Sequence, residues 1–343
     1  MLGAAPASAV ADECKPLVLL TSVDMIPMTS GRVFVPVKFG DEEKRMLLDT
    51  GGGFSEISEA FTDEMEFNQR RSNIMQLDVN GTSSSMIAHV PSMSVGRLTA
   101  TSADLIVGTR DRPYDRGNPE LVGILGPNLL RNYDVELNFA ANRMNLFSPD
   151  HCQDKVVYWP ATAVAVIPVQ ILSDGHIIVP VTLDGRKLDA LFDTGAMHTT
   201  LNLRIAENTF GLRPRTGDMR AIGHLPGDPY ATIYRRDFHS LTLEGISIGN
   251  PQVDIVPDLV RNWFLSAGGD PTGTRLSGVA GPRGLPDLIL GMDVLRSLRI
   301  YISYKEEKLY ITPMATSDLS PDDDILSPRV AAEPAGRAEP GQR

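Results

Sequence analysis

Two copies of the tripeptide Asp-Thr-Gly are the residues of this sequence best suited to chemistry. They are Asp49-Thr50-Gly51 and Asp193-Thr194-Gly195, and each follows a short apolar run. Two aspartates brought together share one proton, because carboxylates about 3 Å apart cannot both ionise. Such a pair can take a proton from water and donate one to a carbonyl oxygen. A single copy would be weak evidence, since Asp and Gly are common turn residues, but two copies at the ends of equivalent strands are strong evidence.

The residues around the two tripeptides repeat at a constant spacing of 144 positions. Arg32-Val33-Phe34-Val35-Pro36-Val37 precedes the first aspartate as His176-Ile177-Ile178-Val179-Pro180-Val181 precedes the second. This self-similarity indicates an internal duplication, which sets the architecture of the whole chain.

A second pair of motifs follows the tripeptides at a spacing of 165 positions. Ile124-Leu125-Gly126 corresponds to Ile289-Leu290-Gly291, and the match continues to Leu146-Phe147 against Ile311-Thr312. The second copy therefore has 21 more residues between its two motifs. We expect this excess in a surface loop rich in Gly, Pro and Asp at residues 258–286.

The duplication predicts two lobes. The first repeat is expected at residues 16–150 and the second repeat at 166–314, joined by a linker at 151–165. Two domains suit a chain of 343 residues. Pro, Ala, Asp and Arg dominate residues 315–343, where we expect a disordered tail.

Composition and charge argue against several classes of protein. Apolar residues make up 42% and charged residues 22% of the chain, as in a globular protein with a packed core. The net charge is −11, and Lys and Arg form no run, which argues against nucleic acid or an anionic membrane surface as the partner. No stretch of about 18 apolar residues occurs, so no membrane span is expected.

The N-terminus and the cysteines indicate a periplasmic or secreted protein. Residues 1–15 contain Ala9-Val10-Ala11, which is typical of the end of a secretory signal, while a disordered alanine-rich start explains the same composition. Cys14 precedes the first strand of the first repeat and Cys152 follows its last strand. We expect a disulfide between them, which agrees with export, and two free thiols are the alternative.

Strands position the two aspartates. Apolar residues alternate over 33–37 as in a half-buried strand, and Pro36 and Pro180 predict that these strands lie at an edge or a bulge. The apolar residues 46–48 then run directly into Asp49. This aspartate is therefore expected where a buried strand becomes a loop.

A hairpin is expected in each repeat. In the first, two strands flank a polar tip at residues 80–85, where Asn80-Gly81 is a strong hairpin signal. In the second, the equivalent hairpin is expected around residues 219–233, with Gly223 near its tip.

Each of the later glycine motifs predicts a short helix. Asn128 is expected to cap a helix at residues 129–132, and Asp293 one at residues 294–298. The strands expected to close the two repeats lie at residues 134–139, 143–147, 300–304 and 308–311.

Together these motifs resemble those of the aspartic proteases of the retropepsin and pepsin type. That family has a hydrophobic-hydrophobic-Asp-Thr-Gly motif and a later hydrophobic-hydrophobic-Gly motif on each of two lobes. The matching segments are 47–51 with 124–130 and 191–195 with 289–295, and the likeness covers about residues 30–312. The chain looks most like bacterial retropepsin-like proteases with two units fused. The resemblance implies an all-β, two-lobed, pepsin-like fold with pseudo-twofold symmetry.

The resemblance also implies roles for the motif residues. Asp49 and Asp193 would form the catalytic dyad of an aspartic endopeptidase. The threonine hydroxyls would join the two loops, and the glycine N–H groups would bond to the carboxylates. These supporting residues are Thr50, Gly51, Thr194 and Gly195.

Further residues follow from the same resemblance. The hairpins near Gly81 and Gly223 would be flaps over an extended polypeptide, the expected substrate, with apolar residues beside the cut. Gly126 and Gly291 would be structural. No metal or cofactor is implied, and a monomer is expected because one chain carries both aspartates.

Two other interpretations stay open. One is a catalytically silent peptide-binding protein of the same fold, and the other is a protease that processes a single target. One residue departs from the family pattern, in which Ser or Ala follows the glycine. Ala196 conforms and Gly52 does not, so Asp49 is expected to titrate differently from its counterpart.

Overall fold

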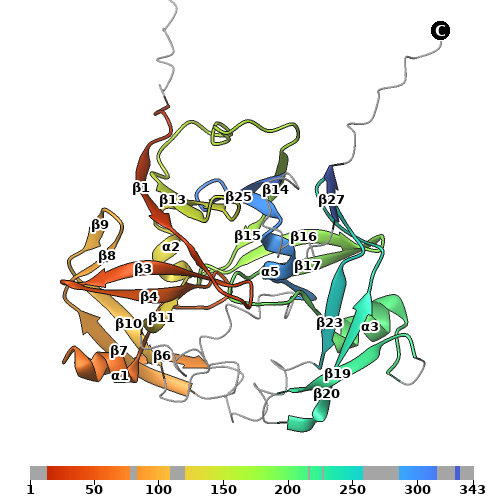
Figure 1. Cartoon of the computed structure of the whole chain (residues 1–343), viewed down its shortest axis with the longest axis horizontal. Coiled ribbons are helices and arrows are strands. Elements are labelled where there is room, and N and C mark those ends of the chain that lie inside the picture. Colours follow the sequence, from red (N-terminus) through yellow and green to blue (C-terminus); the bar gives the residue numbers. More distant parts are fainter. Residues whose placement is uncertain are drawn as a thin grey trace, which may run out of the picture.

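The computed structural model describes residues 14–77, 83–108, 120–214, 217–225, 228–257, 286–314 and 329–332. Within these ranges the protein is built from three β-sheets with a few short helices (Figure 1). The helices are α1 (Glu59–Glu64), α2 (Pro127–Leu130), α3 (Leu203–Phe210) and α5 (Met292–Leu295). The all-β, two-lobed fold expected from the sequence is confirmed.

The first repeat forms a ten-stranded sheet in the order β6-β7-β10-β5-β11-β4-β3-β8-β9, with β2 paired to β3. Its strands are β2 (Ile26–Pro27), β3 (Val33–Phe39), β4 (Glu42–Leu48), β5 (Glu56–Ser58), β6 (Asn68–Leu77), β7 (Ser83–Val90), β8 (Met93–Val95), β9 (Leu98–Ala100), β10 (Ala103–Gly108) and β11 (Leu121–Leu125).

The second repeat forms an eleven-stranded sheet in the order β19-β20-β23-β18-β24-β17-β16-β21-β22-β27, with β15 paired to β16. Its strands are β15 (Gln170–Ile171), β16 (Ile177–Leu183), β17 (Arg186–Phe192), β18 (Thr200–Asn202), β19 (Arg220–Leu225), β20 (Asp228–Asp237), β21 (Ser240–Leu243), β22 (Ile246–Gly249), β23 (Gln252–Val256), β24 (Leu288–Leu290) and β27 (Arg329–Ala332). Apart from β27, this order matches that of the first sheet strand for strand.

A six-stranded sheet joins the two repeats, with the order β1-β13-β12-β25-β26-β14. It lies at the top of Figure 1, above the two large sheets. Its strands are β1 (Leu19–Asp24), β12 (Asp134–Asn138), β13 (Arg143–Phe147), β14 (Ala165–Pro168), β25 (Leu298–Ser303) and β26 (Lys308–Pro313). The expectation that β12 and β13 close one lobe while β25 and β26 close the other is therefore wrong. Each half would leave an open strand edge, and pairing β12 with β25 satisfies the backbone groups of both.

The hydrophobic core runs through all three sheets without interruption. Val35, Val135, Val179 and Ile300 come from four different strands, and each is fully buried in one continuous cluster. The linker at 151–165 is packed rather than loose, because Trp159 is buried against the six-stranded sheet. The repeats are thus held together by a common core as well as by a common sheet.

The two prolines within strands lie where one side of the strand is free. Pro36 faces Arg45 on β4, whereas the other neighbour, β8, pairs only with the last two residues of β3. Pro180 faces Asp189 in the same way, and β21 pairs only with the end of β16. Proline lacks the N–H that a second neighbour would need, so these positions are locally edges.

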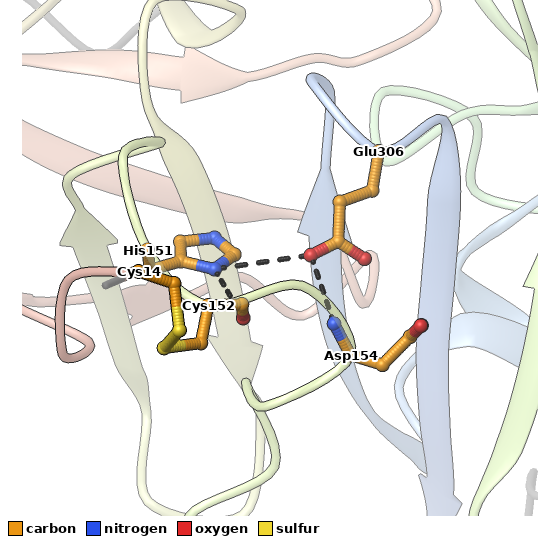
Figure 2. The surroundings of a disulfide bond; sticks show 5 residues. All are labelled: Cys14, His151, Cys152, Asp154 and Glu306. Atoms are coloured by element: carbon orange, nitrogen blue, oxygen red, sulfur yellow. Dashed lines mark hydrogen bonds and ion pairs between the residues drawn. A yellow bond between two sulfur atoms is a disulfide. The ribbon is translucent and has the colours of Figure 1, made fainter. Parts of the chain in front are cut away.

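A disulfide joins Cys14 to Cys152 across 138 residues of sequence, as expected. Closing so long a loop stabilises a protein by about 2–4 kcal/mol. Figure 2 shows His151 beside the bridge, with Nδ1 3.8 Å from the Oε1 atom of Glu306. Nε2 of the same imidazole lies 2.6 Å from Asp134. The N-terminal segment, the linker and the second repeat therefore meet at one point.

Several expectations fall outside the described residues. These are the signal-like start at 1–13, the tip residue Gly81, and the loop at 258–286 except for its last residue. The tail at 315–343 also lies outside, except for strand β27, which pairs with β22. Strand β27 (Arg329–Ala332) thus lies within the segment for which the sequence predicts disorder.

Candidate active site

Each Asp-Thr-Gly loop begins where a central strand ends. Strand β4 runs parallel to β11, and the backbone N–H of Asp49 continues their pairing by donating to Leu125 at 3.1 Å. Strand β17 runs parallel to β24, and Asp193 donates to Leu290 at the same distance. Two buried strands on each side therefore fix where the aspartates stand.

The two carboxyl groups face each other across the junction of the repeats. A Cβ atom added to Gly51 would overlap the carboxyl group of Asp193, and one added to Gly195 would overlap that of Asp49. Each carboxyl group therefore rests on the backbone of the opposite loop. Only glycine permits this approach, which explains the third residue of both tripeptides.

Backbone N–H groups hold each carboxylate in place. The Oδ1 atom of Asp49 accepts from Gly51 at 2.9 Å and from Gly52 at 2.7 Å. The donors to the Oδ1 atom of Asp193, at 2.8 and 3.0 Å, are Gly195 and Ala196. Gly52 thus supplies the same N–H bond as its counterpart, because the bond needs no side chain.

The threonines lock the two loops together. The hydroxyl of Thr50 accepts from the N–H of Thr194 at 3.1 Å and donates to the carbonyl of Phe192 at 2.9 Å. The hydroxyl of Thr194 accepts from the N–H of Thr50 and donates to Leu48 at the same two distances. Both threonines are buried. This reciprocal set of four bonds crosses from one repeat to the other and prevents the aspartates from moving apart.

Behind the first loop, Asn128 holds a neighbouring turn rather than capping a helix. Its Oδ1 atom accepts from the N–H and the hydroxyl of Ser55 at 2.7 and 2.8 Å. The N–H of Gly126 donates to the same hydroxyl. Helix α2 begins after Gly126 and has no side-chain cap. The predicted cap is therefore wrong, because the amide has a better partner far away in sequence.

The second repeat has the same arrangement with different residues. Asp293 accepts from the N–H of Thr199 at 2.9 Å and from its hydroxyl at 2.7 Å, and Gly291 donates to that hydroxyl. Asp293 does not cap α5, which begins after Gly291 without a side-chain cap. The backbone of His198 lies so close to Gly291 that no Cβ would fit there. The side chain of His198 is half exposed and lies 3.9 Å from Asp293.

Burial raises the pKa of both facing aspartates. Burial, and then the neighbouring Asp49 carboxylate, raise the pKa of Asp193 to about 8. Burial also raises the pKa of Asp49, while the N–H bonds from its own loop and the charge of His176 act in the opposite direction. The two carboxyl groups bond to each other, as they do when a pair of carboxyl groups shares a proton.

Two basic residues that the sequence did not assign to the site lie beside this pair. His176 contacts the carbonyl of Gly51 through Nε2 at 2.8 Å. Arg32 is half-buried, and the charges of Asp49 and Asp193 raise its pKa, although burial lowers it more. The signal was present in the sequence, because the two basic residues are 144 positions apart, as the aspartates are.

The hairpins stand apart from the core of each sheet. In the first repeat β6 and β7 pair around the undescribed tip that contains Gly81. In the second, β19 and β20 pair, and Gly223 on β19 has open space where a side chain would be. Both hairpins lie at the bottom of Figure 1, on the side opposite the six-stranded sheet.

Other kinds of site find no support in the described part of the chain. No three His, Cys, Asp or Glu side chains there are grouped to hold a metal ion. Nor does any helix within those residues have the length and apolar character needed to cross a bilayer.

The fold and the site define a two-lobed all-β protein in which two Asp-Thr-Gly loops face each other. The chain belongs to the aspartyl protease family, whose pattern it matches over residues 35–129 and 179–294. Among solved structures, the basic 7S globulin from soybean is similar over 88% of this chain and 96% of that chain, at 10% identity and a TM-score of 0.44. No curated protein matches the sequence.

Proposed function

We propose that this protein is an aspartic endopeptidase and that Asp49 and Asp193 are its catalytic dyad. The observation that carries the proposal is the position of the two carboxyl groups, each resting on the glycine of the opposite loop. Aspartates that serve only as turn residues need no such contact. The supporting residues are Thr50, Gly51, Thr194 and Gly195, with Gly126 and Gly291 in structural roles.

A pair with one proton can perform both proton transfers of peptide hydrolysis. The carboxylate of Asp49 takes a proton from water as its oxygen attacks the carbonyl carbon, and the carboxylic acid of Asp193 protonates the carbonyl oxygen. The resulting diol collapses as Asp49 passes its new proton to the amide nitrogen, the C–N bond breaks, and one diol hydroxyl gives its proton to Asp193 to form the carboxylic acid product. The dyad is left with one proton, as at the start.

The proposed substrate is an extended polypeptide covered by the hairpins near Gly81 and Gly223. Hairpin β19–β20 supports this role, because it carries apolar side chains that are exposed to solvent. Tyr230 is 93% exposed, and Ile222 is also an exposed apolar residue. Apolar side chains on a projecting hairpin fit a substrate with apolar residues around the cut.

The setting of the enzyme belongs to the same proposal. We place it in the periplasm or outside the cell, because the disulfide between Cys14 and Cys152 needs an oxidising compartment. It would act as a monomer of two lobes, residues 16–150 and 166–314, since one chain supplies both aspartates and every contact between them.

The decisive test is digestion of a diverse peptide library between about pH 3.5 and 9, with wild type beside Asp49→Asn and Asp193→Asn. Either substitution removes one of the two proton-transfer groups, and we expect turnover to fall by about 10³–10⁴-fold. In wild type the rate of cleavage should decrease above pH 8, where Asp193 loses its proton. Mass spectrometry gives the products, and thermal unfolding checks that the variants are folded.

Each outcome of this test separates the proposal from an alternative. Peptides that bind to folded wild type without being cut at any pH would show a binding protein. Cleavage of one sequence alone would show a processing enzyme. Undiminished turnover in either variant would remove the dyad assignment.

A further inference from the structure

The two contacts of the His176 ring favour a charged imidazole. Nε2 lies 2.8 Å from the carbonyl oxygen of Gly51, and Nδ1 lies 2.8 Å from the carboxylate of Asp174, in an ion pair. A carbonyl oxygen can only accept, so Nε2 carries a proton. The contact of Nδ1 with Asp174 lacks hydrogen-bond geometry, but an unprotonated Nδ1 would turn its lone pair toward that carboxylate. The side chain is only 4% exposed, so water does not replace either partner.

The carbonyl that His176 contacts belongs to the peptide bond between Gly51 and Gly52. The N–H of that same peptide donates to the Oδ1 atom of Asp49 at 2.7 Å. A cation on the carbonyl polarises the amide and strengthens the bond that its N–H donates. One peptide unit therefore links the imidazole to one carboxylate of the facing pair.

The second repeat lacks this link. The equivalent N–H, that of Ala196, donates to Asp193 at the longer distance of 3.0 Å. Arg32 stands where His176 stands in the other repeat, but its Nε bonds to Ser30, and no hydrogen bond among the described residues joins it to Gly195. Ser30 in turn occupies the position of Asp174.

We propose that His176, held by Asp174, is a positioning residue that places the negative charge of the pair on Asp49 and leaves the proton on Asp193. This inference rests on the proposed function, since it assigns the base and the acid within that dyad. The two loops alone are nearly symmetric, so an asymmetric neighbour is needed to distinguish the two carboxyl groups.

The charges around His176 set the sign of the effect. Besides Asp174 on the same hairpin, Asp193 and Asp49 face it from the two loops. Arg131, which follows the last residue of α2, reaches the same turn but bonds to the carbonyl of Ser173. The cation on His176 lowers the pKa of Asp49, so removing it must raise that pKa.

The test compares His176→Gln with Asp174→Asn. Glutamine keeps an N–H donor for Gly51 but has no charge, so the acid limb of the kcat/KM profile should move up by about 0.5–1 pH unit. Asp174→Asn leaves the imidazole charged at acid pH. It removes an anion that raises the pKa of Asp49, so the acid limb of the kcat/KM profile should move to lower pH. Shifts of opposite sign cannot come from loosened packing alone.

Two further variants serve as controls. His176→Arg keeps a positive charge but, like Arg32 in the other repeat, is not expected to bond to the loop carbonyl, so the acid limb should move up by less than in His176→Gln. His239→Gln removes an exposed histidine that is paired with Asp184 and should change nothing. The ¹³Cγ NMR titration of the aspartates reads the same shifts without any need for turnover.

The outcomes distinguish this inference from the proposed function. Wild type that cleaves no peptide refutes the function, while the NMR titration still reports on His176. Active wild type whose acid limb stays in place in both His176→Gln and Asp174→Asn overturns the inference and leaves the function intact. Shifts of the same sign in both variants overturn it as well.

Discussion

The two repeats are nearly identical at the facing aspartates and differ just outside them. The cross-bonds of Thr50 and Thr194 have matching lengths. One step away, the first repeat has Arg32 beside a serine, whereas the second has His176 beside an aspartate. Duplication within one chain permits this difference, since two identical chains would have to present the same residue on both sides. The comparison shows that the two repeats are alike at the threonine bonds that join them and differ at positions 32 and 176, beside the aspartates.

The shared sheet shows the same principle. Glu136 of β12 stands opposite Tyr301 of β25. Tyr301 is also the residue of the second repeat that corresponds to Glu136, because the two are 165 positions apart. Identical repeats would place two glutamates face to face at this point. Instead, Arg299 of the second repeat binds the buried carboxylate of Glu136 at 2.6 Å, although its equivalent in the first repeat is Asp134. The two repeats therefore meet in an attractive contact at a point where identical repeats would repel each other.

The strongest way to break this comparison is Arg299→Asp, which copies the residue of the first repeat into the second. Glu136 would keep its bonds to Tyr158 and Asn145 but would lose the ion pair with Arg299, which is its only cationic partner among the described residues, while fully buried. We expect the free energy of unfolding in urea to fall by about 3–5 kcal/mol.

A surface substitution provides the control for this loss. Arg143→Asp disrupts an exposed ion pair with Asp24 and should cost less than about 1 kcal/mol. The double variant Glu136→Gln with Arg299→Asp should recover part of the stability. A loss below 1 kcal/mol for Arg299→Asp alone would show that charge complementarity does not hold the junction.

Thr50→Val and Thr194→Val test whether the four hydrogen bonds between the two loops contribute equally from both repeats. Each substitution leaves one N–H and one C=O buried without a partner, so each should cost about 2–4 kcal/mol of unfolding free energy. Because the bond lengths match, the two losses should agree, and Thr→Ser at either position should restore most of the stability. Losses that differ by more than about 1 kcal/mol would extend the asymmetry of the repeats into the lock itself.

Gly52→Ala gives the smallest expected effect and copies the second repeat into the first. The added Cβ would lie 3.2 Å from the Oδ2 atom of Asp49, so the carboxyl group must shift by a few tenths of an ångström. The N–H bond stays, as it does for Ala196. We expect kcat/KM to fall by less than about threefold. A loss of tenfold or more would show that glycine is required here.

Local patterns predicted the strands, the hairpins and the pair of aspartates, because each depends on residues close together in sequence. The duplication added evidence, since every motif had to occur twice. The role of Asn128 could not be predicted, because an asparagine after a glycine is also a good helix cap and its actual partner Ser55 is 73 residues away. His176 was missed for a similar reason, as 125 residues separate it from Gly51. The partners of β12 and β25 were also beyond reach, since strand periodicity shows which face is buried but not which strand lies alongside.

The central pairing of β12 with β25 also means that β12 is synthesised well before the strand with which it pairs. Asp134 and Tyr301 touch in the finished protein but are 167 residues apart in sequence. At ordinary rates of synthesis, roughly 10–30 s pass between the appearance of the two. Throughout that interval β12 is an unpaired strand edge that can pair with other chains. The first repeat is therefore most exposed to aggregation during synthesis, before β25 is available to pair with β12.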